Sequence, residues 1–172
     1  MKTLMMLVVS GLLLVSASGG QPAPARSAPV NSKALVGLWK LARIEARRAD
    51  GTVGADPDLG PHAQGYIYYD AAGHMGVQLM NPERPRWKSE DKPTAEEALV
   101  SSQGFEAYSG TYEVQDGYVV HHLELSYNPN VVGQAWKRKY EVRGPELRLT
   151  PPAITLYSGE KIEETLVWQR VR

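Results

Sequence analysis

The sequence has no cysteine among its 172 residues. This excludes structural disulfides, thiolate metal sites and a cysteine nucleophile. It also excludes a bacterial lipid anchor, which requires a cysteine directly after the N-terminal hydrophobic stretch. Phenylalanine is nearly absent as well, with one residue against nine tyrosines and four tryptophans. The aromatic residues of this chain therefore almost all carry a polar atom.

The sequence has no excess charge, since 19 basic residues balance 19 acidic ones. No block of lysine and arginine stands out, so nucleic acid is not an expected partner. No basic amphipathic helix suggests attachment to a membrane surface.

Long apolar runs are confined to the N-terminus. A lysine precedes an apolar stretch that extends to Val15, and small residues follow up to Gly19. This layout predicts a secretory signal peptide over residues 1–19. A membrane anchor is the alternative, but the run is short for a span of about 20 residues. We therefore expect an exported protein, periplasmic or secreted, with no stable membrane insertion after cleavage.

Residues 20–33 are rich in proline, alanine and serine and lack periodicity, which predicts a flexible linker. The folded domain is expected to cover residues 34–172, enough for one hydrophobic core.

Beyond the linker, apolar residues recur mostly with a period of two, which is typical of half-buried strands. Turn residues divide this pattern into expected strands over residues 35–49, 65–69, 74–80, 106–115, 118–127, 134–143, 146–150 and 161–171. A helix remains an alternative for the first segment, which contains good helix formers. One short helix is predicted after Thr94, where Glu97 completes a capping box, and it ends at Gly104. Regular strands with short turns indicate an antiparallel sandwich or barrel.

Alternation along the strands sorts the aromatic residues onto one face. The expected inward side chains include Tyr108, Tyr112, Trp136 and Tyr140, with Val119, His121, Leu123, Leu125 and Tyr127 on one strand and Arg138 on the next. A core that needs only packing favours side chains without polar atoms, so this composition favours a partly polar cavity. The alternatives are that His121 is a satisfied core residue and that Arg138 stacks on an aromatic ring.

The sequence also resembles the bacterial lipocalin-like domain family of calycin-type barrels. The matching segments include "LVGLWKL", "GYIYYDAAGHMGVQLM", "GFEAYSGTYEV", "VVHHLELSYNPNVVGQAWKRKYEV" and the closing "LVWQRV". The resemblance implies an antiparallel up-and-down barrel of about eight strands, with a cavity that binds small hydrophobic molecules. It also implies that Trp39 packs against Arg170 or Arg172 to close one end. It supplies no catalytic set.

These observations predict binding of a small hydrophobic or amphipathic molecule inside the barrel. The expected lining residues are Tyr66, Tyr68, Tyr108, Tyr112, His121, Trp136, Arg138 and Tyr140. Arg138 would attract an anionic head group. No cofactor is expected. A metal site is not expected either, because the adjacent His121 and His122 point to opposite faces of their strand.

Two other functions compete with simple binding. An isomerase or cyclase would use His121 as base, with Tyr112 or Tyr108 as its partner. A protein-interaction module is the third alternative. Residues 74–80 are ambiguous, because either His74 and Gln78 or the apolar Met75, Val77 and Leu79 could face the cavity.

Overall fold

The computed structural model describes residues 32–155 and 159–172. The predicted signal peptide and most of the predicted linker lie outside the described residues. Within the described ranges, no helix combines the length and apolar character needed to cross a membrane.

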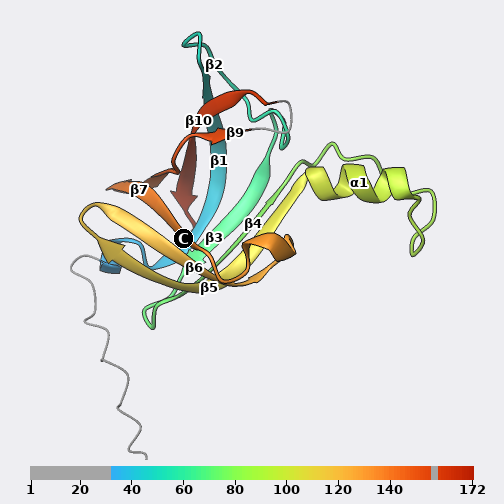
Figure 1. The fold of residues 1–172 in the computed structure, drawn as a ribbon. Coiled ribbons are helices and arrows are strands. Elements are labelled where there is room, and N and C mark those ends of the chain that lie inside the picture. Colours follow the sequence, from blue (N-terminus) through green and yellow to red (C-terminus); the bar gives the residue numbers. More distant parts are fainter. Residues whose placement is uncertain (1–31, 156–158) are drawn as a thin grey trace, which may run out of the picture.

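The fold is a closed antiparallel barrel of eight strands, one of the two architectures that the strand pattern indicated and the one that the family resemblance implied. The strands are β1 (Gly37–Arg48), β3 (Gln64–Tyr69), β4 (His74–Met80), β5 (Phe105–Gln115), β6 (Tyr118–Ser126), β7 (Ala135–Arg143), β8 (Glu146–Thr150) and β10 (Lys161–Arg170). Sequential neighbours pair, and β1 also pairs with β10, which closes the sheet on itself and removes exposed edges (Figure 1).

Among the described residues, five shorter elements lie outside the eight barrel strands. They are the 3-10 turns η1 (Ser32–Ala34) and η2 (Pro129–Val131), the two-residue strands β2 (Val53–Gly54) and β9 (Ile154–Thr155), and α1 (Ala95–Gln103). The predicted capping box is present, with Glu97 N–H donating to Thr94 Oγ1 at 3.2 Å and Thr94 N–H to Glu97 at 2.8 Å. The helix has no buried residue and projects away from the barrel (Figure 1).

A bulge between β5 and β6 changes which β6 side chains face inward. Leu123 pairs with Gly110 and Leu125 pairs with Ser109, so one extra residue of β6 lies between them. Gly110 permits this, because a Cβ there would collide with the carbonyl oxygen of His122. Leu125 therefore points outward and is 70% exposed, which corrects the prediction that it shares the inner face with Leu123.

Trp39 and Arg170 close one end of the barrel, as the resemblance implied. The guanidinium carbon of Arg170 lies 3.9 Å from the centre of the Trp39 ring. Arg170 also donates to the carbonyl oxygens of Ala34 and Val36, at 2.6 Å each. Trp39 is fully buried and its indole N–H donates to Leu35. The cation thus ties η1 and the start of β1 to the end of β10.

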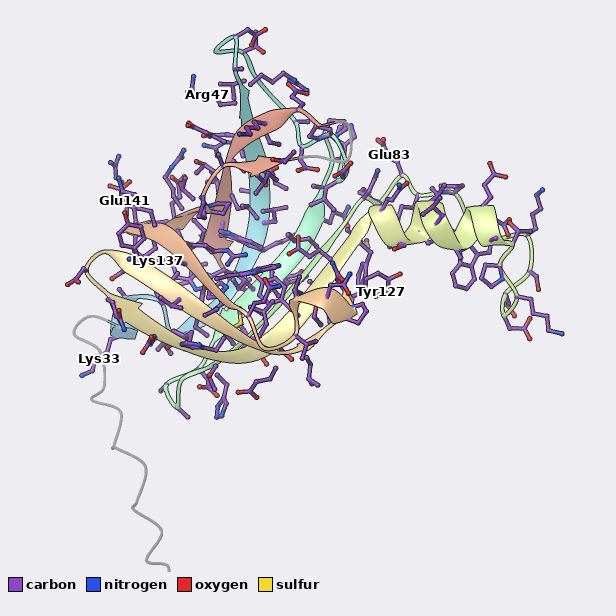
Figure 2. The ribbon with its side chains drawn as sticks, viewed as in Figure 1. Lys33, Arg47, Glu83, Tyr127, Lys137 and Glu141 are labelled. Carbon is purple, nitrogen blue, oxygen red and sulfur yellow. The ribbon has the colours of Figure 1, made fainter. Side chains whose placement is uncertain are left out.

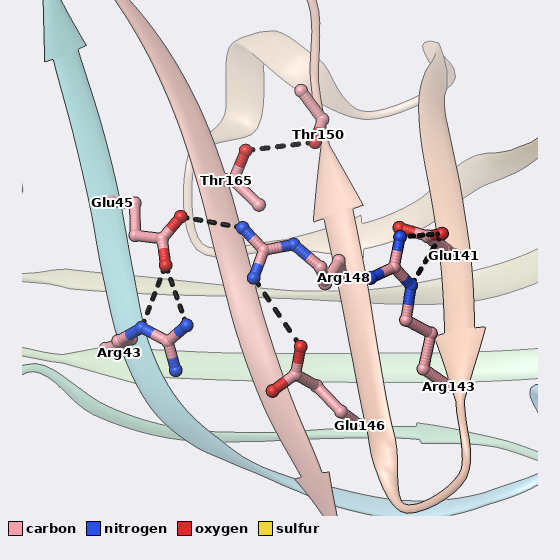
Figure 3. A network of polar contacts seen from close by, with 8 residues as sticks. All are labelled: Arg43, Glu45, Glu141, Arg143, Glu146, Arg148, Thr150 and Thr165. Carbon is pink, nitrogen blue, oxygen red and sulfur yellow. Dashed lines mark hydrogen bonds and ion pairs between the residues drawn. The ribbon is translucent and has the colours of Figure 1, made fainter.

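Ion pairs span the seam where the sheet closes. Glu45 on β1 accepts from Arg148 on β8 at 2.7 Å, so this pair crosses over β10, the strand between them (Figure 3). Arg43 approaches the same carboxylate at 2.8 Å. A network of several charges holds its geometry better than an isolated surface pair.

Candidate ligand-binding site

A buried histidine lies between two tyrosines inside the barrel. His121 on β6 is fully buried. Its Nε2 is 2.8 Å from the Tyr69 hydroxyl, and its Nδ1 is 3.3 Å from the Tyr108 hydroxyl. These tyrosines belong to β3 and β5, so the three side chains link separate parts of the barrel wall.

Burial keeps this triad uncharged. It lowers the pKa of His121 well below its ordinary value, and the nearby charges of Arg138 and His122 lower the pKa further. Burial also raises the pKa of the Tyr69 and Tyr108 hydroxyls. A neutral imidazole has one donor and one acceptor nitrogen. One tyrosine therefore donates to His121 and the other accepts from it, so both ring nitrogens are already engaged.

Arg138 lies against two aromatic rings, next to this triad. It faces inward from β7, with its guanidinium carbon 5.0 Å from the Trp136 ring centre and 5.7 Å from that of Tyr108. The Trp136 and Tyr108 rings meet edge to face, with centres 5.2 Å apart. Trp136, Arg138 and Tyr140 are half-buried although they face inward, so this part of the interior remains accessible.

Tyr112 occupies a different position from the one that the enzymatic alternative requires. It is buried on the inner face, but its hydroxyl donates to the carbonyl oxygen of Asp70 at 2.8 Å. Its ring packs edge-on against Tyr69, with centres 4.8 Å apart. Tyr112 therefore stabilises the β3–β4 turn, and Tyr69 and Tyr108 are the tyrosines that contact His121.

Tyr66 and Tyr68 do not line the barrel interior, which corrects their predicted place. They are 48% and 44% exposed, while their neighbours Ile67 and Tyr69 are buried. Successive strand side chains point to opposite faces, so the buried Ile67 and Tyr69 fix this choice. His74 and Gln78 on the paired strand are exposed as well, and Met75, Val77 and Leu79 face inward.

Carboxylic acids lie inside the other end of the barrel and were not foreseen. Burial, together with the adjacent Asp56, raises the pKa of Glu164 to about 9. Burial also raises the pKa of Glu106, although Arg138 opposes that shift. Asp56 belongs to the loop before β3, where it accepts from the backbone N–H of Asp58 at 2.8 Å. Alternation offered a signal for two of these acids, since Glu106 precedes Tyr108 by two residues and Glu164 precedes Leu166 by two.

Two buried polar atoms in the described part of the chain lack a hydrogen-bond partner. They are Oε1 of Glu164 and the indole Nε1 of Trp168. Both residues belong to β10 and are at most 8% exposed. An unpaired buried polar group costs about 1–3 kcal/mol, so each of these atoms would gain from a complementary ligand atom.

Across residues 32–155 and 159–172, no three histidine, aspartate or glutamate side chains gather in a way that could hold a metal ion.

The lipocalin-like domain model matches residues 36–171 of the sequence, which is nearly all of the described barrel. The chain belongs to the lipocalin-like domain family. This lipocalin-like domain is 28% identical over 107 residues to a 4′-hydroxy-3′-methoxypropiophenone carrier protein of Aspergillus oryzae, a match that covers 56% of this chain and 96% of that protein.

Solved structures give a weaker likeness. A lipocalin-like protein from Bacteroides uniformis aligns with 80% of this chain and 99% of its own, with 15% identity and a TM-score of 0.40. A protein from Bacteroides eggerthii aligns over the same shares, with 16% identity and a TM-score of 0.38.

Proposed function

We propose that this lipocalin-like domain binds a small, partly hydrophobic molecule inside the barrel, next to Tyr108, Trp136 and Arg138. The observation that carries the proposal is that the inward guanidinium of Arg138 has little hydrogen bonding of its own. Within the described residues it forms no ion pair, and its hydrogen bond to the Trp136 carbonyl oxygen is long, at 3.5 Å. A guanidinium has several N–H donors, and an inward one is costly unless an acceptor meets it. A ligand with an acceptor or anionic group supplies that partner.

The aromatic rings around Arg138 define the rest of the ligand. Trp136 and Tyr108 offer apolar faces, and Tyr140 packs against the same core cluster. Ligand sites in proteins typically combine such apolar walls with a few directed polar groups. A compact ring system that carries a carbonyl, carboxylate or sulfonate group fits this description.

Binding is better supported than catalysis by this geometry. A general base needs a lone pair that can reach the substrate proton. Both nitrogens of His121 already contact tyrosine hydroxyls, and the Tyr112 hydroxyl contacts Asp70. The isomerase or cyclase alternative requires a His121 nitrogen or a Tyr112 hydroxyl that is free to meet the substrate, and these groups already have partners.

The relative from Aspergillus oryzae supports the same kind of function, because its name describes a carrier of an aryl ketone. A ketone oxygen is an acceptor to which the Arg138 guanidinium, whose one hydrogen bond in the described residues is long, can donate. The pattern of residues 1–19 supports a location in the cell envelope, where we propose that this chain acts.

Binding of a fluorescent dye tests the proposal. Anilinonaphthalene sulfonate combines aromatic rings with an anionic group, so it should bind the purified protein saturably. Arg138→Gln should weaken that binding at least about tenfold, because a charge-assisted hydrogen bond contributes about 1.5–3 kcal/mol. Lys137→Gln is the matched control, since Lys137 is exposed on the opposite face of the same strand. Equal affinity of the two variants would contradict the assignment of Arg138.

A further inference from the structure

An open groove of about 540 Å³ lies on the outer wall of the barrel, where Tyr66, Tyr68, Leu125 and Tyr127 are exposed. Its volume is within the range of small-molecule sites in proteins. Residues that the sequence alone assigned to the interior, Tyr66 and Tyr68, form one side of it. We propose that this groove binds a neutral carbohydrate, and this proposal does not depend on the function of the interior.

Two rows of paired residues build the groove across four strands. In one row Tyr68 pairs with Gly76, Gly76 with Ser109, and Ser109 with Leu125. The large residues stand at the ends of this row, on β3 and β6, and the small ones lie between them. The row is therefore a shallow trough with walls of tyrosine and leucine.

The second row repeats the same arrangement one step along the strands. Tyr66 pairs with Gln78, Gln78 pairs with Ala107, and the Tyr127 N–H donates to the Ala107 carbonyl oxygen at 2.8 Å. Tyr127 lies on the outside of the barrel, beyond the end of β6 (Figure 2). Three strand spacings of about 4.8 Å separate β3 from β6, so the backbones of the two walls are about 14 Å apart.

The bulge in β6 is what places the second wall on the outside. Leu125 is 70% exposed and Tyr127 is 52% exposed because the extra residue at Glu124 reverses the alternation beyond Leu123. Exposed apolar residues that gather in one patch often mark a binding site.

The chemistry of the lining selects the class of ligand. Aromatic faces from Tyr66, Tyr68 and Tyr127 lie beside the amide of Gln78 and the hydroxyl of Ser109, and no charged side chain lines the groove. An anion or cation would find no partner charge there. A sugar ring matches this surface, because its apolar C–H face stacks on an aromatic ring while its hydroxyls meet amides and hydroxyls at its edge.

The Tyr68 ring covers the floor of the groove at Gly76 and provides its stacking surface. A Cβ at Gly76 would come within 2.6 Å of the Tyr68 ring, so this tyrosine leans over the glycine. Any larger residue at Gly76 would displace the ring that forms the stacking surface.

Titration with soluble neutral oligosaccharides tests the proposal. We would add maltohexaose, cellohexaose and xylohexaose separately and follow the backbone amide signals of Ser109 and Leu125 by NMR. At least one saccharide should shift these signals saturably. Tyr68→Ala and Tyr127→Ala should each weaken binding about tenfold, while Tyr118→Ala, an exposed tyrosine outside the groove, should leave it unchanged.

A second variant keeps the test decisive if a tyrosine-to-alanine variant fails to fold. Gln78→Trp fills the groove at an exposed strand position, where an aromatic residue is well tolerated, and it should abolish saccharide binding while dye binding in the interior persists. The proposal is overturned if no saccharide produces saturable shifts, or if Gln78→Trp binds like the unaltered protein. Self-association in sedimentation velocity that Tyr127→Ala removes would assign the groove to a second copy of the chain and also overturn it.

Discussion

The Tyr69 hydroxyl lies 2.8 Å from Nε2 of the fully buried His121, although 52 residues of sequence separate the two. This contact joins β3 to β6 across the interior, and Tyr108 completes it from β5. The triad joins three polar groups within a core cluster that consists mostly of apolar side chains. Buried networks of this kind stabilise only when each polar group has its partner.

Tyr69→Phe should destabilise the fold by about 1–3 kcal/mol, because the ring stays while Nε2 of His121 loses its partner. Urea unfolding followed by circular dichroism measures this change. Tyr118→Phe is the control, because that exposed side chain forms no hydrogen bond through its hydroxyl in the described residues. An unfolding free energy for Tyr69→Phe equal to that of the control would contradict the role of the triad.

The low pKa of His121 predicts a loss of stability in mild acid. The unfolded state takes up a proton near the ordinary pKa of 6.5, and the folded state does not until the pH is much lower. The contribution of His121 is therefore complete above pH 6.5 and falls by up to about 1.4 kcal/mol per pH unit below it. The difference in unfolding free energy between the unaltered protein and His121→Gln isolates this contribution.

The neighbouring His122→Gln provides the matched comparison for that experiment. Its side chain is half-buried and 3.4 Å from Glu113, so its removal should keep the acid dependence of the unaltered protein. A difference for His121→Gln that stays constant between pH 7.5 and 5 would exclude a depressed histidine pKa.

Glu164 predicts that folding stability depends on pH in the opposite direction. Its pKa is raised from the ordinary 4.5 to about 9, so the unfolded state loses its proton first as the pH rises. The stability linked to this group is complete below pH 4.5 and is lost progressively toward pH 9. Glu164→Gln should therefore be more stable than the unaltered protein at pH 8, and Glu163→Gln, on the exposed face of the same strand, should not. Thermal unfolding at pH 6 and pH 8 would show whether only Glu164→Gln reduces the alkaline loss.

Arg170 should be essential for the closed end in a way that lysine cannot replace. Arg170→Ala removes the contact with Trp39 and two hydrogen bonds to backbone carbonyls, so we expect a loss of about 2 kcal/mol or more. Arg170→Lys should recover little, because an ammonium lacks the planar fork that reaches both carbonyls. Arg172→Ala, an exposed residue, should change stability by less than about 0.5 kcal/mol. Thermal melts of the three variants test this order.

Much of the barrel follows from the sequence, because period-two alternation and turn residues are local signals. They place the strands, the α1 cap and the inward position of His121 and Arg138. The family resemblance adds the Trp39–Arg170 contact. Residues 74–80 are ambiguous in the sequence, because either their polar or their apolar side chains could face the cavity. The burial of Met75, Val77 and Leu79 decides that the apolar ones face inward.

Other features depend on contacts that no local pattern encodes. The bulge at Gly110 reverses the direction of Leu125, because an extra residue shifts the alternation without changing the composition of β6. The acidic end of the interior forms when the loop that carries Asp56 folds over Glu164. These parts of the structure require pairing between strands or loops that are distant in the sequence.

The indole N–H signals of the four tryptophans give the most direct test of binding inside the barrel. Trp136 and Trp168 face the interior, Trp39 lies at the closed end bonded to Leu35, and Trp87 lies outside the barrel bonded to Ser101. A proton–nitrogen correlation spectrum resolves them during titration with anilinonaphthalene sulfonate. We predict saturable shifts of the Trp136 and Trp168 signals while the Trp87 signal stays in place. Unmoved Trp136 and Trp168 signals at dye saturation would contradict a ligand site within this barrel.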